Sequence, residues 1–291
     1  MAKPPNKVPA ATVGVWKRLR RVCFLLVVSL LGFYGVFYFA QTSLVAEGEP
    51  GPLAINPKVH GREYEDVAMP VGDETTFGWY MPVPNARGVV LFCHGNGGNM
   101  TIHYPATKVQ QTMGFSTMMF DYGGFGLSTG QPTEARVYAD ARAAWRWLTV
   151  TKSIPAKDII IWGASFGGGV ACQLATEVSP GALVLESTYL SVPEAASDHT
   201  PGVPWNLLVR CKLANKDKIG KVKCPVMIIH STEDTLFPIR HGRGLYERAN
   251  KPKILIEIRG DHGQATINRD PFVPQMDAFL EPYFPHGGDA E

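Results

Sequence analysis

The chain contains a series of short apolar runs that alternate with helical patterns, and this alternation restricts the folds open to it. The runs lie at residues 89–93, 116–122, 158–162, 182–185, 226–229 and 254–258. Between them, residues 133–151 and 166–178 carry apolar side chains at helical spacing. Strands that are apolar on both faces and separated by helices form a mostly parallel sheet with helices on both sides. We therefore expect one α/β domain over residues 61–285.

A second constraint is an uncharged segment near the N-terminus. Residues 22–40 contain 16 apolar residues in 19, and no charge occurs between Arg21 and Glu47. As a helix, this segment would span about 28 Å, close to the roughly 30 Å hydrocarbon core of a bilayer. A cleaved signal peptide is the alternative, but it has a shorter apolar run and a small-x-small cleavage site. We expect an uncleaved transmembrane anchor at 22–40, in contact with membrane lipid.

The charges are distributed unevenly along the chain. Residues 1–21 hold six basic residues and no acidic one, whereas the rest holds 22 basic and 26 acidic residues. Positive charge on the N-terminal side predicts that tail 1–21 is cytoplasmic and that the body lies on the periplasmic, lumenal or extracellular side. Residues 41–60, which contain three prolines, are expected to be an irregular linker. A net charge of only +2 argues against nucleic-acid binding through a broad basic surface.

The five cysteines do not suggest a disulfide scaffold or a zinc site. Cys211 and Cys224, which are flanked by polar residues, could pair in an oxidising compartment or remain free thiols. No motif in the chain points to a metal or a cofactor, and the oligomeric state is left open.

Two segments match the G-x-S-x-G pattern of a nucleophile elbow, namely 163–167 and 126–130. An elbow requires a strand that runs directly into the turn and a helix that starts just after the serine. Ser165 meets both conditions. Ser128 lies six residues beyond the predicted strand end at Tyr122, in a glycine-rich loop. We therefore predict Ser165 as the nucleophile.

A nucleophilic serine needs a histidine base and an acid that orients it, in the chain order serine, acid, histidine. His262 follows the last predicted strand, and Asp234 follows the strand before it. Glu186, at the end of a third strand, is the strongest rival acid. Asp261 adjoins the histidine, and Glu233 would point away if Asp234 points inward. We predict His262 as the base and Asp234 as the acid.

Acyl transfer also needs hydrogen-bond donors for the negative oxygen of the tetrahedral intermediate. The loop 94–99, H-G-N-G-G-N, follows the first predicted core strand. Its glycines allow backbone N–H groups to approach a substrate closely. We expect the backbone N–H groups of Asn96 and Phe166 to form the oxyanion hole.

Taken together, these motifs resemble the α/β-hydrolase superfamily, and within it the membrane-anchored α/β-hydrolase-domain serine hydrolases. The resemblance covers about residues 61–285 and rests on motifs at 94–99, 121–130, 163–167, 234–238 and 260–263. It implies that Ser165, Asp234 and His262 are nucleophile, acid and base. One departure is Gly123, where the family commonly has arginine. The family includes carboxylesterases, lysophospholipases, protein thioesterases and some peptidases.

The resemblance also implies a short lid insertion at about 188–223, which is apolar in places. We expect the substrate to be a small-molecule or lipid-like acyl ester, or an acylated protein. The expected activity is hydrolysis of a carboxylic ester or thioester through an acyl-enzyme intermediate. Two alternatives remain open at this point: a membrane-anchored interaction module without catalysis, and a serine peptidase.

Overall fold

The computed structural model describes residues 10–45, 48–265 and 272–286. The chain divides into two compact units, Met1–Gln41 and Thr42–Glu291. Part of the expected basic tail, with Lys3 and Lys7, lies outside the described residues.

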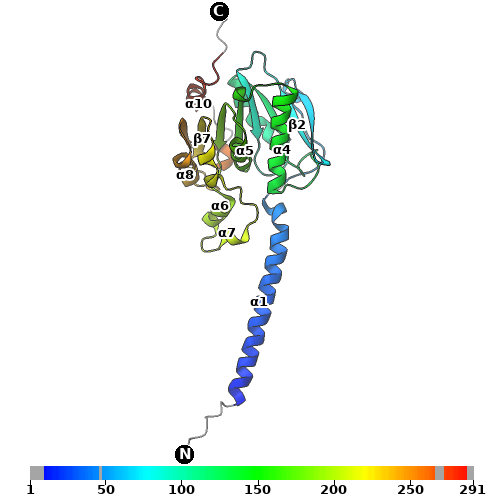
Figure 1. Cartoon of the computed structure of the whole chain (residues 1–291), viewed down its shortest axis with the longest axis vertical. Helices are drawn as coiled ribbons and strands as arrows, with labels where there is room; N and C mark the ends of the chain where they lie inside the picture. The colour runs from blue at the N-terminus through cyan, green and yellow to red at the C-terminus, as the bar shows by residue number, and fades with distance from the viewer. Residues whose placement is uncertain (1–9, 46–47, 266–271, 287–291) are drawn as a thin grey trace, which may run out of the picture. The chain divides into compact units, whose positions relative to one another are not determined.

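The first unit consists mainly of helix α1 (Ala10–Val45) (Figure 1). Within it, Gly14–Val36 is long and apolar enough to cross a membrane, with a mean hydropathy of 1.8 and no buried residue in its most apolar part. The helix extends beyond the expected span 22–40 at both ends because no proline interrupts it between residues 10 and 45. Residues 41–45, which we expected to be part of an irregular linker, are therefore helical.

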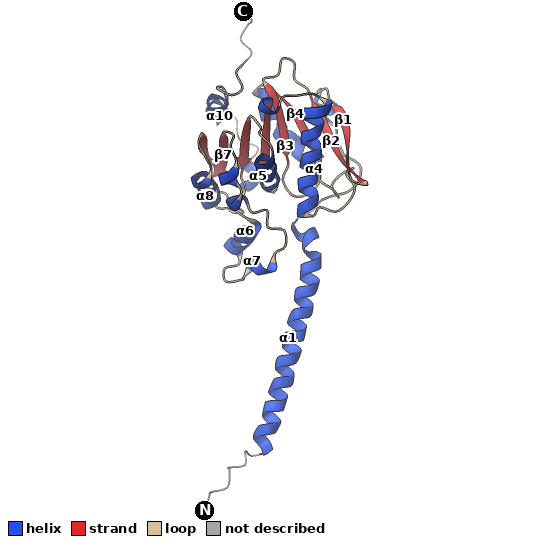
Figure 2. Cartoon of the chain, viewed as in Figure 1, coloured by secondary structure: helices blue, strands red, loops and turns tan. Residues whose placement is uncertain are grey.

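The second unit contains an eight-stranded sheet with strand order β1-β2-β4-β3-β5-β6-β7-β8 (Figure 2). Strand β2 is antiparallel to β1 and β4, and every other neighbouring pair is parallel. The strands are β1 (Glu65–Val71), β2 (Glu74–Met81), β3 (Gly88–Cys93), β4 (Phe115–Phe120), β5 (Ile159–Ala164), β6 (Ala182–Glu186), β7 (Val226–Ser231) and β8 (Lys253–Ile258). The six expected strands and the mostly parallel sheet are confirmed.

The hairpin β1–β2 was not expected from the sequence. Its turn contains Gly72 with φ +62°, in the left-handed region where glycine is favoured. Along β1, buried residues alternate with exposed ones, so only Val67 and Met69 are fully buried. An edge hairpin of this kind lacks the continuous apolar run by which the central strands could be recognised.

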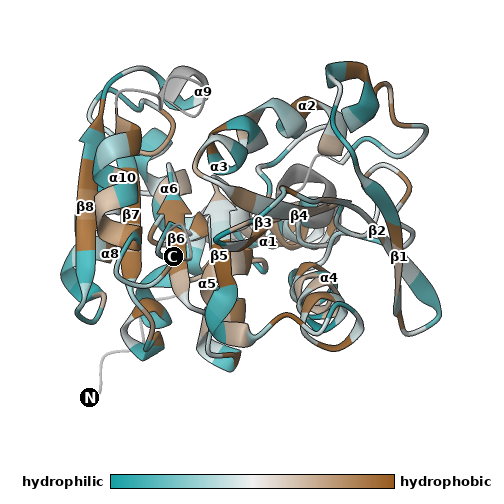
Figure 3. Cartoon of the chain, turned by 90° about the horizontal axis from the view of Figure 1, so that it is seen from above, coloured by the Kyte–Doolittle hydropathy of each residue, from teal (hydrophilic) through white to brown (hydrophobic). Residues whose placement is uncertain are grey.

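Helices cover both faces of the sheet (Figure 3). Strand β3 illustrates the two layers, since Val89 and Leu91 belong to one core cluster and Val90 and Phe92 to the other. The helices are α2 (Met100–His103), α3 (Lys108–Thr112), α4 (Glu134–Arg146), α5 (Gly167–Glu177), α6 (Val192–His199), α7 (Trp205–Leu208), α8 (Arg240–Arg248), α9 (His262–Ala265) and α10 (Val273–Leu280). The cluster that contains Val89 and Leu91 packs under α4, α5 and α8, and the other cluster packs under α2, α3 and α10.

Helix α5 matches the expected helix 166–178 closely, whereas α4 covers only the first part of the expected helix 133–151. Thr133 caps α4, because its side-chain oxygen accepts a hydrogen bond from the backbone N–H of Arg136 at 3.1 Å. The chain continues past α4 in a π-helical turn, Trp147–Thr151, so the expected helix 133–151 is divided into two parts. The segment between β6 and β7 contains α6, α7 and two 3₁₀ turns, Asn215–Asp217 and Ile219–Lys221.

Candidate active site

Ser165 lies in the sharp turn between β5 and α5. Its φ is +52°, which is strained for a residue with a side chain. The turn is held from the neighbouring strand, because the backbone N–H of Ser165 donates to the carbonyl of Glu186 at 2.8 Å. The hydroxyl of Thr188 donates to the Ser165 carbonyl at 2.7 Å. These bonds fix a strained backbone that exposes the serine side chain beyond the end of the strand.

The glycines on either side of this serine have no room for a side chain. A Cβ on Gly163 would lie 2.5 Å from the Cβ of Ala171 and the carbonyl oxygen of Gly167. A Cβ on Gly167 would overlap the carbonyl oxygen of Cys93, at the end of β3. The requirement for small residues at both positions therefore comes from close packing of α5 against β5 and β3.

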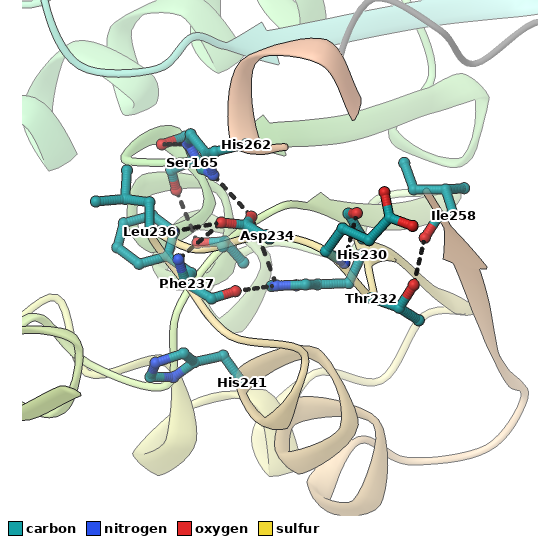
Figure 4. Close-up of polar contacts among 12 residues, drawn as sticks. Ser165, His230, Thr232, Asp234, Leu236, Phe237, His241, Ile258 and His262 are labelled. Atoms are coloured by element: carbon teal, nitrogen blue, oxygen red, sulfur yellow. Dashed lines mark hydrogen bonds and ion pairs between the residues drawn. The ribbon is translucent and has the colours of Figure 1, made fainter. Parts of the chain in front are cut away.

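Ser165, His262 and Asp234 form one hydrogen-bonded chain (Figure 4). The Oγ of Ser165 is 2.9 Å from Nε2 of His262, and Nδ1 of His262 is 2.8 Å from Oδ2 of Asp234. Asp234 follows β7, and His262 opens α9 after β8. The three side chains thus come from the C-terminal ends of strands β5, β7 and β8, where a parallel α/β sheet places its functional loops.

The second oxygen of Asp234 anchors the loop that carries it. Oδ1 accepts hydrogen bonds from the backbone N–H groups of Leu236 at 2.9 Å and Phe237 at 2.8 Å. Burial alone would raise the pKa of this carboxyl. The hydrogen bonds from His262 and Phe237, with the nearby histidines, outweigh that effect and lower the pKa below its ordinary value. Asp234 is therefore a carboxylate at neutral pH.

A second histidine, His230, also contacts the loop that carries Asp234. Nε2 of His230 donates to the carbonyl of Phe237 at 2.7 Å and lies 3.8 Å from Oδ2 of Asp234. Burial lowers the pKa of His230. His230 lies near the end of β7, and no sequence motif predicted a role for it. Its contacts make it a support of the acid loop.

The other acids considered from sequence are engaged elsewhere. Oε2 of Glu186 accepts a hydrogen bond from the indole N–H of Trp162 at 2.9 Å, inside the core. Oε2 of Glu233 accepts from the backbone N–H of Gly260 at 2.9 Å. Asp261 is exposed next to His262.

Ser128, in the second G-x-S-x-G segment, occupies a different environment. It is only 4% exposed, and its hydroxyl donates to the carbonyl of Asp121 at 2.7 Å. The same oxygen accepts from the backbone N–H of Phe77 at 2.8 Å. Both hydrogen-bonding roles of this hydroxyl therefore serve to hold a loop against β2.

The glycine-rich loop 94–99 lies directly against the elbow. A Cβ on Gly95 would be 3.5 Å from the Cβ of Ser165. Asn96 is partly exposed, whereas Phe166, at the start of α5, is buried. Gly97 and Gly98 have φ values of +81° and +58°, so the loop depends on glycine for its course.

His103 is a neighbour of this loop that the sequence reasoning missed. Its ring stacks on His94 with centroids 4.7 Å apart, and its Nε2 donates to the carbonyl of Gly97 at 3.1 Å. Burial, followed by the proximity of His94, lowers the pKa of His103 to about 3. The chain order serine, acid, histidine places the base after Ser165, and His103 precedes it. The sequence signal available was its position four residues after loop 94–99.

At the position where the related motif commonly has arginine, Gly123 leaves space that Arg136 occupies. A Cβ on Gly123 would lie 2.8 Å from Nε of Arg136. Arg136 donates to Asp140 at 2.7 Å and pairs with Glu74. Asp140 also accepts from the backbone N–H of Gly123 at 2.8 Å. The departure from the motif is therefore accommodated by a helix α4 side chain.

Cysteines and clusters of possible metal ligands lie outside this arrangement. The five cysteines, all within the described residues, are free thiols, and burial raises the pKa of Cys211 and of Cys224 to about 12.

Asp277, Glu281 and His286 bring ligand atoms within 4.8 Å of one another. Both carboxylates already pair with the buried Arg87, so this group acts as an ion-pair cluster that holds α10.

The strand order, the strained serine turn and the hydrogen-bonded side chains define an α/β hydrolase. A family model described as "alpha/beta hydrolase fold" matches residues 88–209. An uncharacterised protein of Mycobacterium tuberculosis is 31% identical over 252 residues, covering 84% of this chain and 88% of that protein. The chain belongs to the α/β-hydrolase family.

Two further similarities extend this result. The lysophosphatidylserine lipase ABHD12 of Danio rerio is 30% identical over 240 residues, covering 72% of this chain and 62% of that protein. The solved structure of the Pyrococcus furiosus esterase Pf2001 has a TM-score of 0.68 at 21% identity, covering 81% of this chain and 99% of that one. The match to the esterase concerns the fold. The family and its relatives together identify the chain as an α/β hydrolase.

Proposed function

We propose that this chain is a serine hydrolase that cleaves carboxylic ester or thioester bonds through an acyl-enzyme intermediate on Ser165. The single observation that carries the proposal is the continuous hydrogen-bonded chain from Ser165 through His262 to Asp234. An orienting acid, a base and a nucleophile in this sequence of contacts are what acyl transfer by serine requires.

In the proposed mechanism, Oγ of Ser165 attacks the acyl carbon while Nε2 of His262 accepts the hydroxyl proton. The carboxylate of Asp234 holds the imidazole through Nδ1–H and stabilises the imidazolium that forms. The backbone N–H groups of Asn96 and Phe166 donate to the oxyanion. The imidazolium then protonates the leaving alcohol or thiol, and a water activated by the same histidine releases the acid and regenerates Ser165.

Labelling with a fluorophosphonate probe tests this proposal. We expect one phosphonate on the wild-type protein, no labelling of Ser165→Ala, and normal labelling of Ser128→Ala, because the Ser128 hydroxyl is bound to backbone on both sides. A folded wild-type protein that does not label would favour the non-catalytic module. Labelling that survives in Ser165→Ala and is lost in Ser128→Ala would show that the elbow was wrongly assigned.

The proposed substrate is an ester with an apolar acyl chain. Two observations support it: the similarity to a lysophosphatidylserine lipase, and exposed apolar residues in the proposed lid insertion 188–223, where Leu207 is 77% exposed and Val203 is 36% exposed. A series of p-nitrophenyl esters from about two to sixteen acyl carbons tests the preference. We expect the highest kcat/KM for medium-length acyl chains. A strong preference for the acetate ester would contradict the proposed apolar acyl chain. Peptide turnover above ester turnover would favour a peptidase.

The proposed location is a single-pass membrane protein with the N-terminus in the cytoplasm. Helix α1 supplies a segment of adequate length and hydropathy, and Lys17, Arg18, Arg20 and Arg21 precede its most apolar part. Under the positive-inside rule, the hydrolase domain then lies on the opposite side of the membrane.

A further inference from the structure

Residues 48–51, here called the strap segment, lie along two loops at the site. The segment forms parallel bridges to both, pairing Gly48 with Gly98 and Pro50 with Gly126. The bonds are made by backbone atoms. The N–H of Glu49 donates to the Gly98 carbonyl at 2.8 Å, and the Glu49 carbonyl accepts from the Gly126 N–H at 2.9 Å. A single residue, Glu49, therefore links loop 94–99 to loop 121–130.

Further contacts keep the strap segment in register. The N–H of Gly51 donates to the Gly126 carbonyl at 2.9 Å. Gly48 lies so close to the ring of Phe125 that a Cβ there would be 2.5 Å from a ring carbon. The Phe125 ring in turn packs on His94, with centroids 5.7 Å apart. The strap segment is thus packed, through one aromatic ring, against the residue that begins loop 94–99.

Loop 94–99 needs such external contacts because its own sequence is permissive. Gly97 and Gly98 both have positive φ, and consecutive glycines have the largest backbone entropy to lose. The carbonyl of Gly97 is held by His103, and that of Gly98 by Glu49. These two hydrogen bonds fix the carbonyls that closely follow Asn96 and so help to set the direction of its backbone N–H. An oxyanion donor is effective only when its direction is set before the reaction.

We propose that the strap segment is a positioning element for the oxyanion hole. This inference rests on the proposed function. In the sequence, the strap segment follows the end of α1 at Val45 by three residues. The stretch of chain between the candidate membrane anchor and the hydrolase domain therefore also binds loop 94–99. It acts through the backbone of loop 94–99 and does not touch the substrate.

A matched pair of variants at one position tests the proposal in the full chain in detergent micelles. Glu49→Pro removes the N–H that donates to Gly98, and Glu49→Ala keeps it while removing an exposed side chain. We expect Glu49→Pro to lower kcat for a p-nitrophenyl ester about 10-fold with KM within about twofold, because the defect lies in transition-state stabilisation. Glu49→Ala should stay within about twofold of wild type in both parameters.

A transition-state analogue separates positioning from loss of folded protein. A trifluoromethyl ketone, which becomes a tetrahedral oxyanion on Ser165, should bind about 10-fold more weakly to Glu49→Pro than to Glu49→Ala. The fraction of molecules labelled at completion by a fluorophosphonate should be the same for both variants. Equal kcat and equal ketone affinity in the two variants would overturn the proposal, as would a loss fully accounted for by unlabelled protein.

Amide hydrogen exchange provides a readout that does not require activity. Glu49→Pro should speed exchange in peptides covering 94–103 and 122–130 relative to Glu49→Ala, and Gly48→Ala should do the same by pushing on Phe125. Unchanged exchange in both variants would overturn the proposal. If the wild type turned over no ester or thioester but exchange changed as expected, the proposed function would fail while the structural role of the strap segment stood.

Discussion

At the scale of single residues, Asp234 is proposed to be the carboxylate that orients His262. It accepts hydrogen bonds from His262 and from two backbone N–H groups, and its pKa is lowered as a result. We expect Asp234→Asn to lower kcat by about 10⁴-fold, since an amide can donate to the imidazole and favour the wrong tautomer. The protein should remain folded, because an asparagine oxygen can still accept from Leu236 and Phe237. Steady-state kinetics with circular dichroism as a folding check measures both effects.

Glu186→Gln is the matched control for that assignment. Glu186 was the strongest rival acid, and a glutamine there still accepts from the Trp162 indole. We expect kcat within about 10-fold of wild type. A larger loss in Glu186→Gln than in Asp234→Asn would transfer the acid role to Glu186.

The residues of the candidate site differ in how far the sequence could predict their positions. The proximity of Ser165, Asp234 and His262 could be predicted because each follows a continuously apolar strand, and parallel strands bring such loops to one edge. His103 and the strap segment were not, because their contacts run to backbone carbonyls and N–H groups. Almost any residue supplies those groups, so no residue type marks the position in advance.

At the scale of elements, the elbow depends on how closely α5 approaches β3. A Cβ on Gly167 would overlap the backbone of Cys93 and His94. We expect Gly167→Ala to lower the free energy of unfolding by roughly 1–3 kcal/mol, as overpacking does, and to reduce kcat by shifting the serine. Chemical denaturation and ester kinetics measure the two losses.

Gly220→Ala serves as the control for this prediction. A Cβ there would lie 3.4 Å from the nearest atom outside its chain neighbours, an ordinary contact. We expect its free energy of unfolding to stay within about 0.5 kcal/mol of wild type. A Gly167→Ala variant as stable and active as Gly220→Ala would contradict the close-packing account of the elbow.

Elements also differ in how well sequence predicted them. The buried central strands were evident, since both of their faces pack against helices. The β1–β2 hairpin was not, because one face of β1 is exposed. The division of the expected helix 133–151 into α4 and a π-helical turn leaves the apolar pattern nearly unchanged, so hydrophobic periodicity alone does not detect it.

At the scale of the whole molecule, buried histidines make stability depend on pH. The pKa of His103 is lowered to about 3, and burial lowers those of His230 and His241 as well. Below the ordinary histidine value of 6.5, the unfolded chain binds protons that the folded one does not. The contribution of these neutral histidines to the free energy of unfolding is therefore complete above pH 6.5 and decreases as the pH falls below it. For His103 the decrease continues to about pH 3.

The contribution of His103 to this pH dependence is measurable. We expect His103→Phe to reduce the slope of unfolding free energy against pH by about 1.4 kcal/mol per unit, or one proton, between about pH 6 and 4. Urea unfolding of the full chain at several pH values gives the slope. An unchanged slope would mean that His103 is protonated in the folded protein.

The proposed orientation of the chain in a membrane rests on its uneven charge. We expect replacement of Lys17, Arg18, Arg20 and Arg21 by glutamine to give a mixed or inverted orientation, because these residues precede the apolar span. Protease protection in sealed vesicles reports which side holds the hydrolase domain. The control changes the same amount of charge at the exposed residues Lys157, Lys221, Lys223 and Lys251. Equal orientation in all three proteins would contradict the positive-inside argument.

The proposed mechanism requires a covalent acyl intermediate on Ser165. Mass spectrometry of protein quenched within the first turnover of a p-nitrophenyl ester detects this intermediate. We predict an added acyl mass close to one per molecule, mapped by digestion to the peptide containing Ser165, together with a burst of nitrophenol of the same size. An acyl group on any other residue, or turnover with no covalent species and no burst in the quenched protein, would contradict the account.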